Sequence, residues 1–217
     1  MKTWTTWLTA AVSVALGGCG QGGQAREVHL TVLTYNVHIG KGMDDKVDLA
    51  RQARVIARLA PDIVALQEVD RRTARSAGVD QFAELVRLTG MQGVYCKTLD
   101  YDGGEFGIAL LSRRAIVEHT FHRLPLEKGH EQRYLIEATL EAPAGAPGRA
   151  AMKELLTQWT LATPADVPTF PARAPLRTLD YILYRPPGAF AVENARVVDE
   201  SLASDHRPVR AVLKLRP

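Results

Sequence analysis

Apolar and polar positions alternate between strand-like and helix-like spacing over the first ordered part of the chain. Residues 30–35 are apolar and β-branched enough for a buried strand. Residues 48–60 have helical spacing with one apolar face, and Pro61 ends this helix. Residues 63–66 are apolar again and predict a second short, buried strand. Two strands joined through a helix lie side by side, so their ends meet at one rim of a sheet.

Asn36 and Glu68 follow these two strands, and we expect them to lie together at that rim. An amide and a carboxylate are hard oxygen ligands, which suit Mg²⁺ or Mn²⁺. Taken alone, either residue has a simpler explanation, because Asn36 also suits a turn and Glu68 a surface salt bridge. Residues 71–78 form a predicted loop near the same rim, and its three arginines either meet an anionic substrate or lie in solvent.

The middle of the chain predicts one helix and a series of strands. Asp80 is a suitable N-cap for the helix, and Gly90 ends it. Short runs separated by tight turns then predict antiparallel strands over residues 93–98, 106–111, 115–121 and 134–140. A small-residue connector (142–148), a helix (150–159) and a proline-rich loop (164–175) follow. The last predicted strands cover residues 178–184, 192–198 and 208–215.

Length and composition are those of one globular domain. The chain has 217 residues, of which 46% are hydrophobic, and this is ample for a core. A net charge of +3 lacks the concentrated basic surface of a dedicated nucleic-acid binder, although a local patch remains open.

The N-terminus predicts a targeting segment. Lys2 precedes a short apolar run, which is too short to span a bilayer, and Leu16-Gly17-Gly18-Cys19 follows. This arrangement resembles a bacterial lipoprotein signal, in which Cys19 is lipidated and becomes the first residue. A plain secretory signal is the alternative. We therefore divide the chain into a signal peptide (1–18), a tether (19–28) and a domain (29–217), in which Cys96 is a buried thiol.

Six short motifs occur in the order found in one enzyme superfamily. They are T-Y-N-V-H (34–38), L-Q-E-V (66–69), G-I-A-L-L-S-R (107–113), Q-R-Y-L-I-E-A-T-L (132–140), L-D-Y-I-L (179–183) and S-D-H-R-P-V (204–209). Together they resemble the endonuclease/exonuclease/phosphatase superfamily, the fold of pancreatic deoxyribonuclease. The resemblance implies an α/β fold, a four-layer α/β/β/α sandwich.

The resemblance also implies a role for individual residues. Glu68 is the main ligand of Mg²⁺ or Mn²⁺, Asn36 helps to order the metal and the phosphate, and Asp205 lies beside the metal. His206 contacts the scissile phosphate, and Asp180 holds its imidazole in one tautomer, as a carboxylate–histidine pair does.

Arg133, in the fourth motif, is expected to contact phosphate or to hold a carboxylate.

Two motifs of the superfamily, T-H-x-D and G-D-F-N, are absent from the sequence. They normally lie where the chain has its connector, so we expect a family segment to be missing near 142–150, together with central strands of the fold. The Asp of G-D-F-N acts on the attacking water and its Asn supports the transition state. We therefore expect a metal-dependent phosphoesterase or nuclease with impaired turnover.

Two alternatives stay open: a non-catalytic lipoprotein that binds metal and anionic phosphate ligands, and an unstable product of a truncated gene. The expected substrate is a phosphate ester, either nucleic acid or a phospholipid-type head group. The expected location is the bacterial envelope, with a monomer held at the outer membrane by its N-terminal lipid.

Overall fold

The computed structural model describes residues 14–17, 27–126, 131–141, 160–185 and 187–216. Within them, the largest sheet has six strands in the order β10-β11-β2-β3-β5-β4. These strands are β2 (His29–Asn36), β3 (Ile63–Arg71), β4 (Gln92–Tyr101), β5 (Gly104–Ser112), β10 (Phe190–Val197) and β11 (Val209–Leu215). Strands β2 and β3 run parallel, as predicted, and the other neighbours pair antiparallel.

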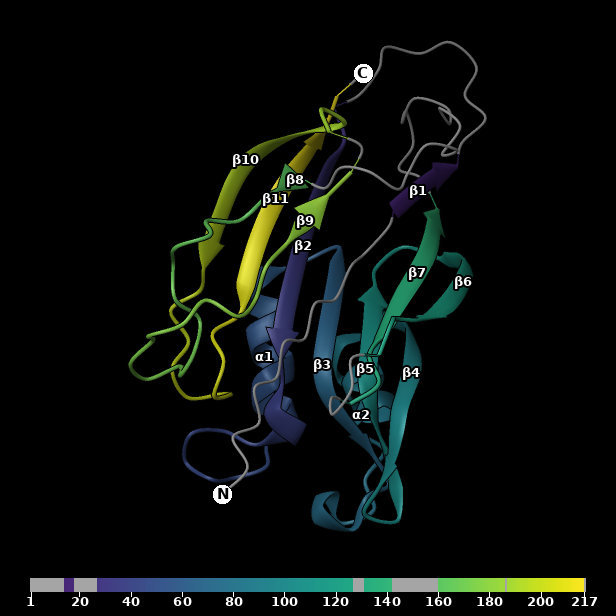
Figure 1. Cartoon of the computed structure of the whole chain (residues 1–217), viewed down its shortest axis with the longest axis vertical. Coiled ribbons are helices and arrows are strands. Elements are labelled where there is room, and N and C mark those ends of the chain that lie inside the picture. Colours follow the sequence, from purple (N-terminus) through teal and green to yellow (C-terminus); the bar gives the residue numbers. More distant parts are fainter. Residues whose placement is uncertain (1–13, 18–26, 127–130, 142–159, 186, 217) are drawn as a thin grey trace.

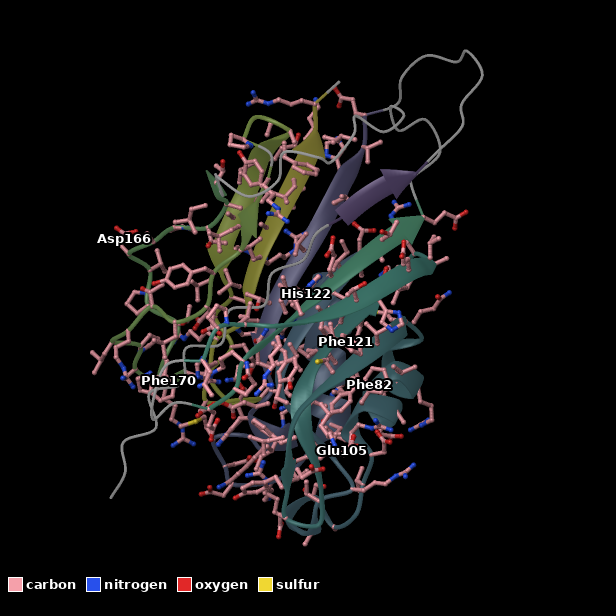
Figure 2. All side chains as sticks on the ribbon, turned by 45° about the vertical axis from the view of Figure 1, so that its right-hand side comes forward. Phe82, Glu105, Phe121, His122, Asp166 and Phe170 are labelled. Atoms are coloured by element: carbon pink, nitrogen blue, oxygen red, sulfur yellow. The ribbon has the colours of Figure 1, made fainter. Side chains whose placement is uncertain are left out.

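Two smaller sheets accompany this one in the described residues. A three-stranded sheet has the order β1-β7-β6, with β1 (Val14–Gly17) parallel to β7 (Tyr134–Glu141) and β6 (Ile116–Arg123) antiparallel to it. Strands β8 (Thr160–Leu161) and β9 (Leu183–Tyr184) form a short antiparallel pair. Figure 2 shows Phe121 and His122 on β6, at the outer edge of the three-stranded sheet.

The predicted strand at 178–184 is wrong for most of its length, because only Leu183–Tyr184 pairs as a strand. The backbone before it is held by threonine side chains instead of a neighbouring strand. The amide of Leu179 donates to Thr169 Oγ1 at 3.1 Å, and that of Ile182 donates to Thr163 Oγ1 at 3.2 Å. Loop contacts far along the chain therefore replace the ladder that the apolar pattern predicts.

Both helices begin and end at residues suited to capping. The Asp48 side chain accepts from the amide of Arg51 at the start of α1 (Leu49–Leu59), and Asp80 accepts from Ala83 at the start of α2 (Gln81–Thr89). Gly90 ends α2 with a φ of 65°, in the left-handed region that favours glycine. Two short 3₁₀ turns, η1 (His38–Gly40) and η2 (Ala74–Ser76), each follow a central strand.

Successive residues of the central strands enter two different cores. Leu33 and Tyr35 of β2 pack in a core shared with α1 and α2, whereas Leu30 and Val32 pack toward β7 in the second core. The two helices therefore cover one face of the six-stranded sheet, and the three-stranded sheet covers part of the other (Figure 1). This α/β/β arrangement confirms the α/β class and supplies three of the four expected layers. The helix predicted at 150–159 lies outside the described residues.

The N-terminal predictions fall mostly outside the part of the chain that the structure describes, including Cys19 and the tether up to residue 26. Residues 14–17 are described and pair with β7, which the sequence does not predict for a signal segment. None of the helices in the described residues is long and apolar enough to cross a membrane.

Candidate active site

The parallel pairing of β2 and β3 brings Asn36 and Glu68 into contact, as predicted. Asn36 Nδ2 donates to Glu68 Oε1 at 2.9 Å, and Asn36 Oδ1 accepts from the His38 amide at 2.9 Å. Both ends of the Asn36 amide are thereby used. In this arrangement Asn36 holds the carboxylate of Glu68, which lines the pocket.

Unusual backbone conformations aim these side chains into the pocket. Glu68 has a φ of 58° at a register shift between β3 and β5, and His38 and Ile39 have φ values of 45° and 51°. Non-glycine residues adopt this left-handed conformation at a cost of roughly 1–3 kcal/mol, and such strain clusters at functional sites. The local geometry at the rim is therefore consistent with a binding or catalytic role.

The electrostatics of Glu68 favour a cation beside it. Burial raises the pKa of Glu68 above its ordinary value, the charge of Asp205 adds to this effect, and the hydrogen bond from Asn36 opposes it. A carboxylate held in this way near a second carboxylate gains from a bound positive charge.

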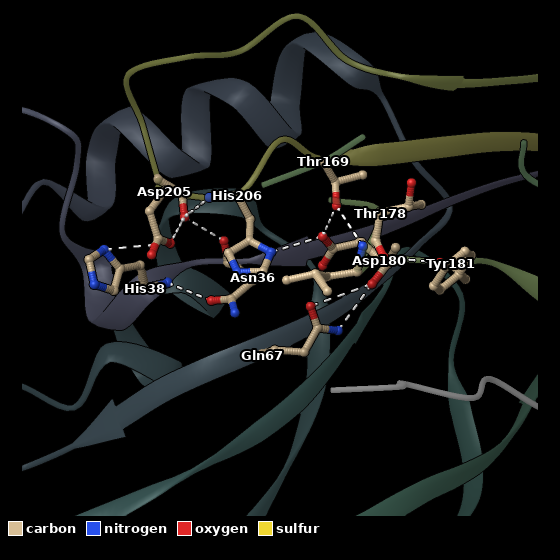
Figure 3. Close-up of polar contacts among 12 residues, drawn as sticks. Asn36, His38, Gln67, Thr169, Thr178, Asp180, Tyr181, Asp205 and His206 are labelled. Atoms are coloured by element: carbon tan, nitrogen blue, oxygen red, sulfur yellow. Dashed lines mark hydrogen bonds and ion pairs between the residues drawn. The ribbon is translucent and has the colours of Figure 1, made fainter. Parts of the chain in front are cut away.

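The second half of the site is a buried pair between Asp180 and His206. Asp180 Oδ2 lies 2.8 Å from His206 Nδ1 and also accepts from Thr169 Oγ1 at 2.6 Å (Figure 3). Burial by itself would lower the pKa of His206, but the hydrogen bond and charge of Asp180, together with the charges of Asp205 and Glu68, raise it. The pair fixes the ring, so Nε2 is the nitrogen left for a ligand.

A loop that the sequence analysis did not assign to the site supports His206. The ring of Phe170 lies 4.8 Å from that of His206, and the Arg177 guanidinium lies 4.9 Å from the Phe170 ring centroid. The backbone of the loop is tied to the histidine segment, since the Ala172 amide donates to the Asp205 carbonyl at 2.7 Å. Figure 2 places Phe170 in this loop.

Asp205 lies between the two halves of the site. Its Oδ1 is 3.6 Å from His38 Nδ1, which is an ion-pair distance for a protonated imidazole and too long for a hydrogen bond. Ser204 Oγ donates to the Asn36 carbonyl at 2.7 Å and so holds the segment preceding β11 against the end of β2.

Glu68, Asp205 and His206 line one pocket of about 480 Å³. Three of its lining residues are acidic, four are basic and the rest are largely apolar: Glu68, Glu131 and Asp205; His38, Arg75, Arg177 and His206; Ile39, Leu99, Tyr101, Phe106, Phe170 and Leu179. The structure thus joins four of the predicted site residues in two contacts, Asn36 with Glu68 and Asp180 with His206. Asp205 lines the same pocket as Glu68 and His206. Arg133 is not among the lining residues, and Glu131 is.

Glu68 and Asp205 form a donor set that fits a hard divalent cation. Both carboxylates line the same pocket. The charge of Asp205 acts on Glu68, and the charges of both residues act on His206. The described residues contain no cluster of three or more His, Cys, Asp and Glu side chains with metal-binding geometry. Water would therefore complete most of an octahedral shell, as is usual for Mg²⁺.

The sequence of the chain matches a known protein family. A sequence model of the Endonuclease/Exonuclease/phosphatase family matches residues 33–151. A search of curated proteins found no significant match.

Solved structures share the fold. An endonuclease/exonuclease/phosphatase from Beutenbergia cavernae is 23% identical over 88% of this chain and 72% of its own, with a TM-score of 0.68. A family protein from Leptotrichia buccalis is 13% identical over 87% of this chain and 100% of its own, with a TM-score of 0.63. A humanized D. rerio TDP2 is 15% identical over 85% of this chain and 98% of its own, with a TM-score of 0.53. The chain belongs to the endonuclease/exonuclease/phosphatase family.

Proposed function

We propose that this chain hydrolyses phosphate esters with the help of Mg²⁺ or Mn²⁺, at a rate lower than that of complete family members. The observation that supports this most directly is that Glu68 and His206 line one pocket, each held by a partner behind it, Glu68 by Asn36 and His206 by Asp180. One pair offers a carboxylate to a metal, and the other offers an oriented imidazole to a phosphate.

Each pair has a defined part in the reaction. Glu68, together with Asp205, would hold the cation, which would neutralise the charge that develops on the phosphate. His206, as an imidazolium, donates from Nε2 to a phosphate oxygen while its Nδ1–H donates to Asp180, whose charge favours the protonated ring.

The reduced rate follows from what the sequence lacks. Without G-D-F-N, no carboxylate at that position orients the attacking water and no amide supports the transition state. Losing one preorganised donor costs about 10²–10³ in rate, and losing a positioned base costs about 10²–10⁴. The two losses need not add, since residues that act as a unit are non-additive.

The test is hydrolysis of bis(p-nitrophenyl) phosphate and of plasmid DNA, with Mg²⁺, with Mn²⁺ and with EDTA. We expect slow, metal-dependent turnover that His206→Ala abolishes. His119→Ala is the matched control, because His119 is an exposed histidine on β6 outside the pocket. Turnover that survives in EDTA or in His206→Ala would contradict the proposal.

A second candidate function is metal and phosphate binding without catalysis. The absence of G-D-F-N from the sequence favours it, because that motif supplies groups for catalysis. Binding of Mn²⁺ and phosphate together with no turnover above the His206→Ala background would select this candidate.

The setting of the protein belongs to the same proposal. Lipidation of Cys19 would hold the domain as a monomer at the bacterial outer membrane, facing the periplasm or the exterior. The substrate there would be nucleic acid or a phospholipid-type head group, since loops around a common core decide among such substrates.

A further inference from the structure

Arg75 enters the pocket from η2 and is held by a buried carboxylate. Its Nε and Nη2 donate to the two oxygens of Asp70 at 2.8 Å each. Asp70 is fully buried and also accepts from Thr73 Oγ1 at 2.7 Å. A bidentate pair of this kind fixes the plane of the guanidinium as well as its position.

Two aromatic rings hold the same guanidinium from the side. Its carbon lies 4.2 Å from the ring centroid of Tyr101 and 5.4 Å from that of Phe106, both of which line the pocket. The ion pair with Asp70 uses only the Nε–Nη2 edge of the Arg75 guanidinium. Among the described residues, no acceptor forms a hydrogen bond with Arg75 Nη1, so a fixed donor edge remains for a ligand.

The order of strands places Arg75 away from the His206 half of the site. His206 precedes β11 and Glu68 lies in β3, whereas the rings that hold Arg75 lie at the ends of β4 and β5. These strand ends share one rim, with β5 next to β3 and β4 beyond it. Asp70, which holds Arg75, follows Glu68 by two residues on β3, and Tyr101 lies on β4, so Arg75 lies on the β4–β5 side of Glu68, whereas His206 lies on the β11 side.

We propose that Arg75 binds a second anionic group of the substrate, a phosphate next to the one that is hydrolysed between Glu68 and His206. This inference rests on the proposed function and narrows its substrate class to esters that carry two neighbouring phosphates. Asp70, Tyr101 and Phe106 act as positioning residues that fix the guanidinium before the substrate arrives, so little side-chain entropy is lost on binding.

The charges of the pocket support this assignment. Glu68 and Asp205 both line it, and a metal held by them would serve the reacting phosphate. A second phosphate needs its own positive partner, and Arg75 is the cation on the β4–β5 side of the pocket lining. A planar guanidinium with a free edge matches phosphate geometry better than a mobile lysine does.

The experiment compares equilibrium binding of thymidine 3′,5′-bisphosphate and thymidine 5′-phosphate by calorimetry in Mg²⁺. The wild type should bind the bisphosphate at least about tenfold more tightly than the monophosphate. This is the difference in affinity expected from one charge-assisted hydrogen bond. In Arg75→Gln the affinities for the two ligands should differ by no more than about threefold, chiefly because the bisphosphate binds more weakly. Arg75→Lys, which keeps the charge and loses the fork, should lie between them.

Arg72→Gln is the matched control, because Arg72 lies in the same loop, is 73% exposed and does not line the pocket. It should keep the wild-type ratio. Thermal unfolding of each variant shows whether it is folded; if Arg75→Gln is not, Arg75→Lys and Tyr101→Leu provide the test. Equal binding of the two ligands by the wild type, binding of neither, or an unchanged ratio in the Arg75 variants would overturn the inference. Failure of the proposed function would be seen separately, as tight bisphosphate binding without any hydrolysis.

Discussion

Asp180 and His206 meet through a hydrogen bond of 2.8 Å, and their side chains are only 5% and 7% exposed. The two residues come from different motifs, yet each is held by the loop that precedes Asp180. Thr169 donates to Asp180, and Phe170 packs against His206. The loop therefore orients the group that would contact the phosphate.

The first prediction concerns this pair. Asp180→Asn keeps the shape of the side chain but removes the charge that orients the imidazole. We expect kcat/KM for bis(p-nitrophenyl) phosphate to fall about 10–100-fold, as for other outer-shell partners. Asp166→Asn, a change in an exposed residue of the preceding loop, should leave the rate unchanged. A rate for Asp180→Asn equal to that of the wild type would show that the pair does not orient the catalytic imidazole.

The second prediction concerns Thr169, which is fully buried and connects Asp180 to the backbone of Leu179. Thr169→Val preserves the volume and removes both hydrogen bonds, leaving buried polar groups without a partner. The free energy of unfolding should fall by about 1–3 kcal/mol in urea denaturation. Thr120→Val, at an exposed position of β6, should change it by no more than about 0.5 kcal/mol. Equal effects of the two substitutions would contradict this account of the loop.

The third prediction concerns Cys96, which is buried on β4 as the sequence analysis expected. Burial raises the pKa of its thiol, so less of the reactive thiolate is present at neutral pH. In a Cys19→Ser background, we expect slow labelling by maleimide in the native protein and fast labelling in denaturant. Val117→Cys, at a position that is 67% exposed, should react quickly in both states. Fast native labelling of Cys96 would show that this part of the core opens readily.

The fourth prediction concerns the membrane anchor. The wild type, expressed in a bacterium, should take up a fatty-acid label and sediment with membranes. Cys19→Ser should lose the label, and Cys96→Ser should keep it. An unlabelled wild-type protein that stays in the soluble fraction would contradict the prediction that Cys19 is lipidated.

Local signals in the sequence were sufficient for the strands and helices that meet at the rim. The parallel β2–β3 pairing places Asn36 beside Glu68, and capping residues mark where α1 and α2 begin. The Asp180–His206 contact was expected from the family resemblance, and the structure brings these residues together. Their functional roles stay predictions.

Other parts of the site depend on contacts that no local pattern reveals. Phe170 and Arg177 lie in a proline-rich loop whose path is set by hydrogen bonds to the segment before β11. Arg75 sits in a polar loop typical of solvent-exposed surface, and only the buried Asp70 and the ring of Tyr101 show that it is fixed. The signal in the sequence was a predicted loop near the rim with three arginines (71–78), which by itself does not separate a ligand from a solvated residue.

The central claim is that Glu68 belongs to a metal site that serves the phosphate beside His206. Calorimetric titration with Mn²⁺ tests it most directly, in the wild type, in Glu68→Gln and in Glu118→Gln, a control at an exposed residue of β6. The account predicts that the wild type and Glu118→Gln bind one Mn²⁺ per chain and that Glu68→Gln binds it at least about tenfold more weakly. Equal Mn²⁺ affinity in Glu68→Gln and the wild type would place the metal elsewhere and contradict the account.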